Sequence, residues 1–216
     1  MTVTRKEDRY YEGDRSDLLD WLGGRHGRVL EVGCGSGGNA AWLRRHGATR
    51  IVGIETDPKS AARAREVFDK VIVESVETAL ADLDESFDLI ICADVLEHLI
   101  DPWAVTSALA GKSAEDGLLL VSVPNIRHYR ALWRIAFGAG FRYEEEGTFD
   151  STHLRFFDRA GLERMLDQAG WMPQRWGGSG GRRIKLLMAP IRRGRPLEFG
   201  VYQWHVVARL APPTSR

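Results

Sequence analysis

A glycine-rich loop between a strand-like run and a helix-like stretch constrains this chain more than any other segment. Gly33, Gly35 and Gly37 directly follow the apolar run Arg28 to Val32 and precede a stretch that suits a helix packed on a sheet. Glycine lets the backbone turn sharply and approach a ligand closely. A second strand-like run, Arg50 to Glu55, completes a βαβ unit, so the loop predicts a nucleotide or nucleoside site.

Strand-like and helix-like segments continue to alternate beyond this unit. A helical segment follows Asp57-Pro58, and apolar runs stand at 71–73, 87–92 and 117–123. These runs hardly alternate with polar residues, which is expected when helices cover both faces of a sheet. Asp101-Pro102 predicts a helix start, with an end near Gly111. The order predicts an α/β, doubly wound, Rossmann-like fold with a mostly parallel sheet.

The rhythm changes after Pro124. An aromatic-rich helix at 128–137 and a loop at 138–150 read as an insertion, at about 125–157, on a single domain spanning 1–216. The remaining expected elements are a helix at 157–170, a strand at 171–176, a flexible glycine turn at 177–181 and an antiparallel final edge strand at 201–210.

Composition restricts the partners. With 216 residues, 44% hydrophobic, the chain can bury one core. Thirty basic residues balance thirty acidic ones, so no overall field attracts nucleic acid. The polar start of the chain has no signal peptide or membrane span, which favours a cytoplasmic protein without a membrane partner. Cys34 and Cys92 have no metal-ligand spacing, and we expect no metal site. Oligomeric state stays open.

Two acidic residues narrow the cofactor. The glycines alone also fit a dinucleotide pattern through Gly38, but Glu31, two residues before Gly33, would repel a pyrophosphate and could bind an ammonium group. Glu55, at the end of the second strand, could accept hydrogen bonds from ribose hydroxyls of either cofactor type. The alternative for each acid is an exposed charge at a strand end.

Three motifs in order resemble the class I S-adenosylmethionine-dependent methyltransferases. The segments are Val29-Leu-Glu-Val-Gly-Cys-Gly-Ser-Gly37, Val52-Gly-Ile-Glu-Thr-Asp57 and Phe87-Asp-Leu-Ile-Ile-Cys-Ala-Asp-Val-Leu-Glu-His98. The segments 124–130 and 152–157 further resemble bacterial small-molecule methyltransferases of sugar, polysaccharide or quinone pathways.

The resemblance implies S-adenosylmethionine as the cofactor. It places Gly33 and Gly35 against the methionine part, Glu55 at the ribose, and the adenine near Ser75, where the family often has aspartate. The cofactor-binding residues expected are Glu31, Gly33, Cys34, Gly35, Gly37, Glu55, Thr56, Ser75, Val76, Glu77, Ala93 and Asp94.

The expected reaction is O-methylation of a small polar or glycosidic acceptor. His153 is the candidate base, oriented by Asp150, although both residues could equally hold the loop in place structurally. His98 is the less favoured histidine. The aromatic insertion is a candidate lid over the acceptor, and Tyr10 and Tyr11 are weak candidates to cover the site. A non-catalytic cofactor-binding partner protein and an NAD-dependent oxidoreductase remain the alternatives.

Overall fold

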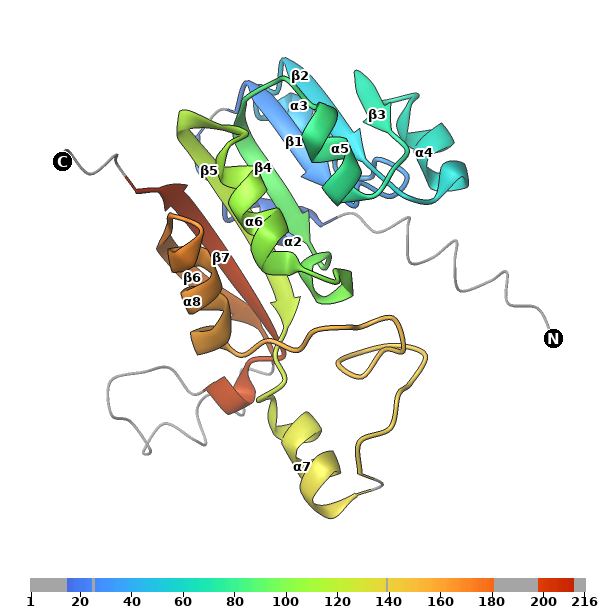
Figure 1. Cartoon of the computed structure of the whole chain (residues 1–216), viewed down its shortest axis with the longest axis vertical. Helices are drawn as coiled ribbons and strands as arrows, with labels where there is room; N and C mark the ends of the chain where they lie inside the picture. The colour runs from blue at the N-terminus through green and yellow to red at the C-terminus, as the bar shows by residue number, and fades with distance from the viewer. Residues whose placement is uncertain (1–14, 25, 139, 181–197, 212–216) are drawn as a thin grey trace.

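The computed structural model describes residues 15–24, 26–138, 140–180 and 198–211 (Figure 1). Tyr10, Tyr11 and Gly181 lie outside these residues. None of the helices in the described part of the chain has the length and apolar run needed to cross a membrane.

One seven-stranded sheet organises the described residues, in the order β3-β2-β1-β4-β5-β7-β6. The first five strands pair in parallel, whereas β7 pairs antiparallel with β5 and β6. The predicted mostly parallel sheet with an antiparallel final strand is therefore confirmed. The strands are β1 Arg28–Val32, β2 Arg50–Ile54, β3 Lys70–Ile72, β4 Phe87–Ala93, β5 Ser113–Pro124, β6 Trp171–Ser179 and β7 Gln203–Leu210.

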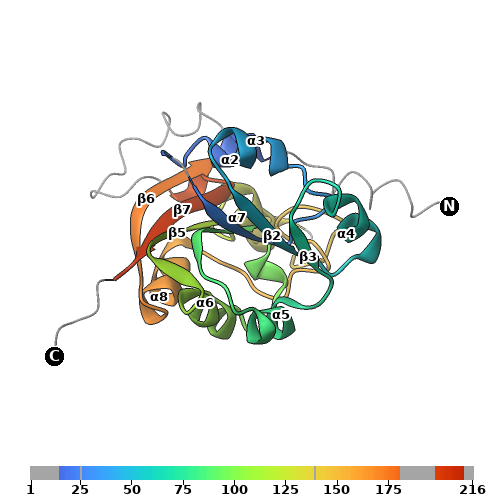
Figure 2. The same cartoon turned by 90° about the horizontal axis from the view of Figure 1, so that it is seen from above.

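Helices cover both faces of the sheet, as the nearly continuous apolar strands predicted (Figure 2). Their apolar sides form two buried clusters, one on each face. One face carries α2 Ser16–Leu19, α3 Ala40–Arg45 and α4 Pro58–Ala64, and the other carries α5 Val76–Asp82, α6 Pro102–Ala110 and α8 Arg159–Gln168.

Aspartates set the starts of three helices. Asp57, Asp101 and Asp158 each accept a hydrogen bond from the backbone N–H three residues later, at 2.7 to 3.0 Å. Such a bond satisfies an N–H that the helix itself leaves unpaired. Proline follows Asp57 and Asp101 at the first helical position, where its missing N–H costs nothing.

The last strand is not at the edge of the sheet. β7 lies between β5 and β6, so β6 forms the edge and the prediction of an edge strand at 201–210 is wrong. Residues 204–208 are all buried, because neighbours pair with β7 on both sides and core clusters cover it. The residues read as alternating do not leave one solvent face.

The glycines after Trp176 continue a strand instead of forming a turn. β6 runs on to Ser179, and Gly177 and Gly178 pair with residues of β7. A Cβ at Gly177 would overlap the ring of Trp21, and one at Gly178 would overlap Val201. Glycine is therefore required here for close packing rather than for flexibility.

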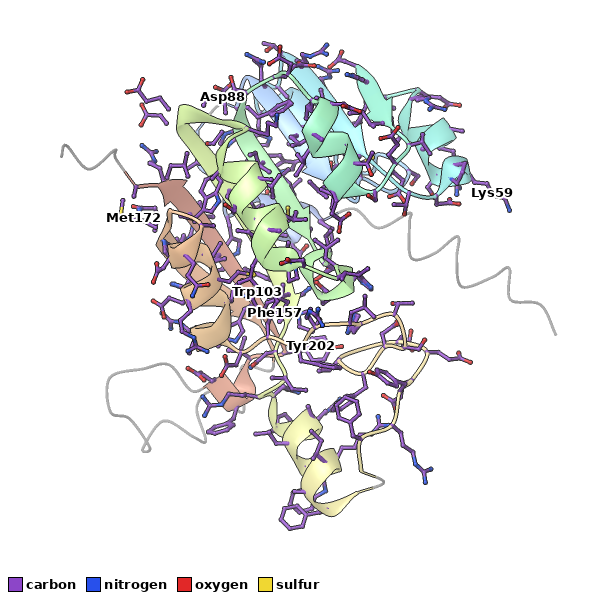
Figure 3. All side chains as sticks on the ribbon, viewed as in Figure 1. Lys59, Asp88, Trp103, Phe157, Met172 and Tyr202 are labelled. Atoms are coloured by element: carbon purple, nitrogen blue, oxygen red, sulfur yellow. The ribbon has the colours of Figure 1, made fainter. Side chains whose placement is uncertain are left out.

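The insertion leaves the sheet where β5 ends. It contains α7, Tyr129–Phe137, and a loop that returns to α8 (Figure 1). The returning chain is fixed beside β5 by a bridge between Asn125 and Phe157, and the Ile126 N–H donates to the Phe157 carbonyl at 2.9 Å. Figure 3 labels Phe157 and Tyr202 in this region. The insertion therefore emerges at the carboxyl end of the parallel strands.

Candidate functional site

The glycine loop has the backbone shape that the sequence predicted. Gly33, Gly35 and Gly37 have φ values of +67°, +52° and +83°, which side chains rarely permit. A Cβ at Gly33 would lie 2.7 Å from Cγ2 of Val95. The Gly33 N–H donates to the Ile54 carbonyl at 2.8 Å and fixes the loop to the end of β2.

Glu31 is an acid buried beneath this loop, with an exposed fraction of only 4%. The amide of Asn39 donates to Oε1 at 2.6 Å, whereas Oε2 is buried and accepts no hydrogen bond from the described residues. Burial raises the pKa of Glu31 to about 7, against the opposing effect of the Asn39 hydrogen bond. A cationic ligand would supply the missing partner, so Glu31 is more than an exposed strand-end charge.

Glu55 connects the end of β2 to the loop. Its carboxylate accepts the Gly35 N–H at 2.9 Å and the Asp57 N–H at 2.8 Å. A carboxylate offers about four lone-pair sites, so further hydroxyl donors remain compatible with these bonds. The orphaned oxygen of Glu31, the glycine loop and Glu55 together fit a cofactor that carries an ammonium group and a ribose.

Other expected cofactor residues have structural tasks. The Cys34 sulfur packs against Gly53, and burial, with the charges of Glu31 and Glu55, raises the pKa of the thiol. Ser75 caps α5 by accepting the Thr78 N–H at 3.3 Å. Of the remaining residues, Val76 is buried, Thr56 and Glu77 are exposed and Ala93 is half-buried.

Asp94 continues the same edge from the end of β4. It has φ +57°, the single non-glycine residue with positive φ in the described ranges. Its carboxylate accepts hydrogen bonds from Ser122, at 3.0 Å, and from Gln203, and it pairs with Arg15. Sequence reasoning missed these three partners and Asn39, because they meet only through the fold.

His153 lies near the residues after β4 but without the predicted orienting partner. Its Nδ1 lies 3.2 Å from the Thr148 carbonyl, whereas Asp150 Oδ1 accepts from the N–H and hydroxyl of Thr152. The prediction that Asp150 orients the imidazole is therefore corrected, because a nearer backbone carbonyl takes that place. His98 contacts His153, with ring centroids 4.8 Å apart.

Glu97 is the residue that sequence reasoning overlooked on this side. It lies in the 3-10 turn η1, Leu96–His98, and its exposed fraction is 1%. Burial raises its pKa well above the ordinary value, and the charge of Asp94 raises it further. Burial also lowers the pKa of His98, and the neighbouring His153 adds to this effect. The adjacent acid and imidazole in Glu97-His98 were a usable signal.

The two parts of the site lie at one edge of the sheet. The glycine loop follows β1, Glu55 follows β2, and Asp94 to His98 follow β4. Since parallel strands end at the same edge, their loops form one continuous surface. The insertion brings His153 to that edge, where the Leu154 and Arg155 N–H groups donate to the Glu97 carbonyl at 2.8 and 3.0 Å.

Comparison with known proteins agrees with this architecture. Residues 3–173 match the family model described as methyltransferase domain. A ubiquinone biosynthesis O-methyltransferase of Neisseria meningitidis serogroup C is 32% identical over 165 residues, which cover 70% of this chain and 68% of the relative.

Solved structures support the fold. A SAM-dependent methyltransferase from Archaeoglobus fulgidus has a TM-score of 0.66 at 17% identity, with 94% of each chain covered. The magnesium protoporphyrin IX methyltransferase of Synechocystis PCC 6803 with bound SAH has a TM-score of 0.64 at 18% identity, covering 95% of this chain and 93% of that one. The chain therefore belongs to the methyltransferase domain family, as an S-adenosylmethionine-dependent methyltransferase with a Rossmann-like fold.

Proposed function

We propose that this enzyme transfers the methyl group of S-adenosylmethionine to a hydroxyl oxygen of a small acceptor. The observation that carries the cofactor assignment is the buried Glu31 oxygen that has no partner among the described residues. The hydroxyl acceptor is supported by the curated relative, whose name specifies O-methylation.

The cofactor would lie along the glycine loop. Glu31 would bind its ammonium group, and Glu55 would accept from the ribose hydroxyls while keeping its bonds to the loop backbone. Gly33 and Gly35 leave room for the methionine part, and Asp94 borders it. Bound S-adenosylmethionine supplies an electrophilic methyl group, so the protein's task is to align an oxygen and remove its proton.

His153 is the proposed group for that proton. A carbonyl oxygen can only accept, so the contact with Thr148 places a proton on Nδ1 and the lone pair on Nε2. A neutral imidazole with this tautomer can act as a general base. Asp150 would contribute through its charge on the same loop rather than through a direct hydrogen bond.

The insertion at about 125–157 would cover the acceptor as a lid on the single domain. Phe141 stacks edge-on with Phe149 and with Phe156, at centroid distances of 5.0 and 5.3 Å. Phe149 is buried, whereas Trp133 and Phe137 on α7 are 67% and 75% exposed. These aromatic residues would exclude water and favour a small acceptor with apolar or aromatic surface.

A product assay tests this proposal. The full chain is incubated with S-adenosylmethionine and a panel of small phenols, sugars and amines, and S-adenosylhomocysteine and methylated products are measured by mass spectrometry. We expect methyl ethers from hydroxyl acceptors. Products formed from amines alone, or cofactor binding without turnover on any acceptor, would overturn the proposal. NAD binding in place of S-adenosylmethionine would do the same.

A further inference from the structure

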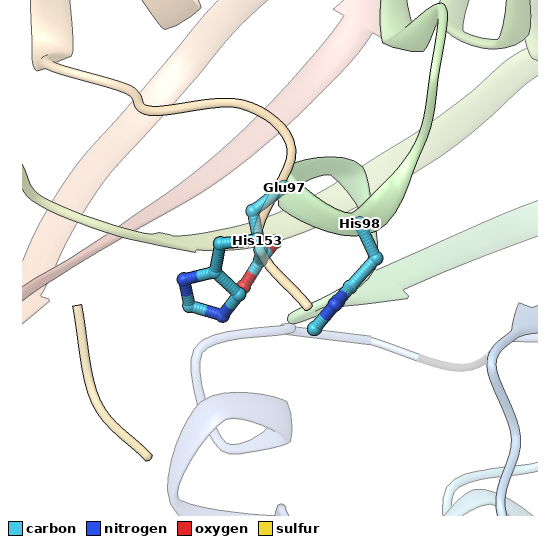
Figure 4. A group of neighbouring side chains, drawn as sticks. All are labelled: Glu97, His98 and His153. Carbon is cyan, nitrogen blue, oxygen red and sulfur yellow. The ribbon is translucent and has the colours of Figure 1, made fainter. Parts of the chain in front are cut away.

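A carboxylate and two imidazoles converge beside the proposed acceptor site. Glu97 and His98 come from η1, and His153 comes from the loop before α8 (Figure 4). One potential ligand atom from each side chain lies within 4.8 Å of the other two. This is a grouping of nitrogen and oxygen donors that bind divalent transition metals.

Glu97 gives the first sign that something is missing from this cluster. The side chain is 99% buried from solvent, yet neither carboxylate oxygen has a hydrogen-bond partner among the described residues. Burying an acid without a partner is costly, and proteins normally satisfy such a group with hydrogen bonds, an ion pair or a metal. No described cation or donor fills that place at Glu97.

The orientation of the histidines gives the second sign. His98 Nδ1 lies 3.2 Å from the Thr152 carbonyl, and His153 Nδ1 lies 3.2 Å from the Thr148 carbonyl. Because carbonyls only accept, both Nδ1 atoms carry protons and both Nε2 atoms carry lone pairs. Histidines that bind metals commonly hold their other ring N–H to a backbone carbonyl in this way, which fixes the tautomer.

The backbone holds the two halves of the cluster together. The Leu154 and Arg155 N–H groups both donate to the Glu97 carbonyl, so the loop carrying His153 is bound directly to η1. Metal bonds of about 2.1 Å place ligands roughly 3 to 3.5 Å apart, so side-chain rotations of these three residues would be needed to close the site.

We propose that Glu97, His98 and His153 bind a divalent first-row transition cation, of the type Mn²⁺, Co²⁺ or Zn²⁺, with open positions for the acceptor oxygen. Two imidazoles and one carboxylate suit such ions better than Mg²⁺ or Ca²⁺, which prefer oxygen ligands. The spacing of 55 residues between His98 and His153 hides this set in the sequence, where no metal site was expected.

The open positions rest on the proposed function and deepen it. The cation would bind the acceptor hydroxyl and make it more acidic. The O–H bond breaks and its proton passes to water. The freed oxygen lone pair forms the C–O bond while the methyl–sulfur bond breaks, leaving its electron pair on sulfur. His153 would then act as a ligand, and the cation would replace it as the means of deprotonation.

Metal titration of the full chain, without cofactor or acceptor, tests the site. Co²⁺ is added after chelator treatment and followed by its visible absorption, and Mn²⁺ binding is measured by calorimetry. We expect one equivalent of each ion. His153→Gln and Glu97→Gln should weaken binding on the order of a hundredfold. The matched controls His46→Gln and Glu66→Gln should bind as the unmodified chain does, because His46 lies before β2 at the opposite sheet edge and Glu66 is exposed.

Several results would overturn the assignment. These are the absence of Co²⁺ absorption in the unmodified chain, or affinity unchanged in His153→Gln. If Glu97→Gln fails to fold, the comparison rests on His153→Gln and on whether Mn²⁺ raises the unfolding temperature of the unmodified chain but not of that variant. Full methylation in chelator with no metal binding would reject only the metal site, whereas metal binding without methylation would reject only the proposed reaction.

Discussion

Cofactor affinity should depend on pH through Glu31. Burial holds the pKa of this carboxyl near 7 in the free protein, so a large share of it is protonated at pH 6. An ammonium group bound to the carboxylate requires the ionised form, and binding must therefore release the proton. For a pKa of about 7, the apparent dissociation constant should be about tenfold larger at pH 6 than at pH 8.

The same shift has a consequence for stability. The native pKa is raised above the model value of 4.5, so the native state binds the proton more tightly than the unfolded state. The free energy of unfolding therefore falls as pH rises from about 4.5 to 7, by about 3 kcal/mol for this group alone. A cationic ligand would offset this penalty by pairing with the ionised carboxylate.

Calorimetry with S-adenosylhomocysteine between pH 6 and 8 measures the effect. Glu31→Gln should bind roughly 10-fold to 100-fold more weakly at pH 8, because a charged hydrogen bond is lost, and should lack the Glu31-dependent change with pH. The exposed Glu66→Gln should retain both the affinity and the pH profile of the unmodified chain. An identical pH profile in Glu31→Gln and the unmodified chain would refute this reasoning.

Three further substitutions probe other parts of the structure. Gly33→Ala places a methyl group against Val95 at positive φ, so we expect a loss of about 1 to 2 kcal/mol in stability and weaker cofactor binding, measured by denaturation and calorimetry. His153→Gln should lower turnover on the order of a hundredfold with cofactor affinity retained; an unchanged rate would remove this residue from the chemistry. Gly177→Ala should lower the unfolding temperature through overlap with Trp21, and Trp21→Ala in the same chain should recover part of that loss.

Elements with local signals were predictable from the sequence. β1 has the predicted bounds, and the Asp101-Pro102 start of α6 is confirmed down to the hydrogen bond of its cap. The glycine loop was predictable for the same reason, since its backbone conformation requires those residues. In these segments the residues that decide the structure are neighbours in the chain.

Features that depend on distant contacts were not predictable. Gly177 looks like part of a turn until Trp21 is seen packed on it. The position of β7 depends on pairing with two other strands, and the partner of His153 depends on how one loop folds against its own backbone. The grouping of Glu97 with His153 likewise requires β4 and the insertion to meet at one sheet edge.

The central position of β7 has a consequence for the order in which the enzyme becomes complete during synthesis. The five parallel strands are all translated by residue 124, but β5 keeps an open edge until Gln203–Leu210 has emerged from the ribosome. β6 must wait as well, because its partner strand in the described sheet is β7. Gln203 also supplies one of the donors to Asp94. The last strand thus joins the edge of the sheet and the cofactor side in one late step, and a chain stopped before it would hold a glycine loop without a finished catalytic surface.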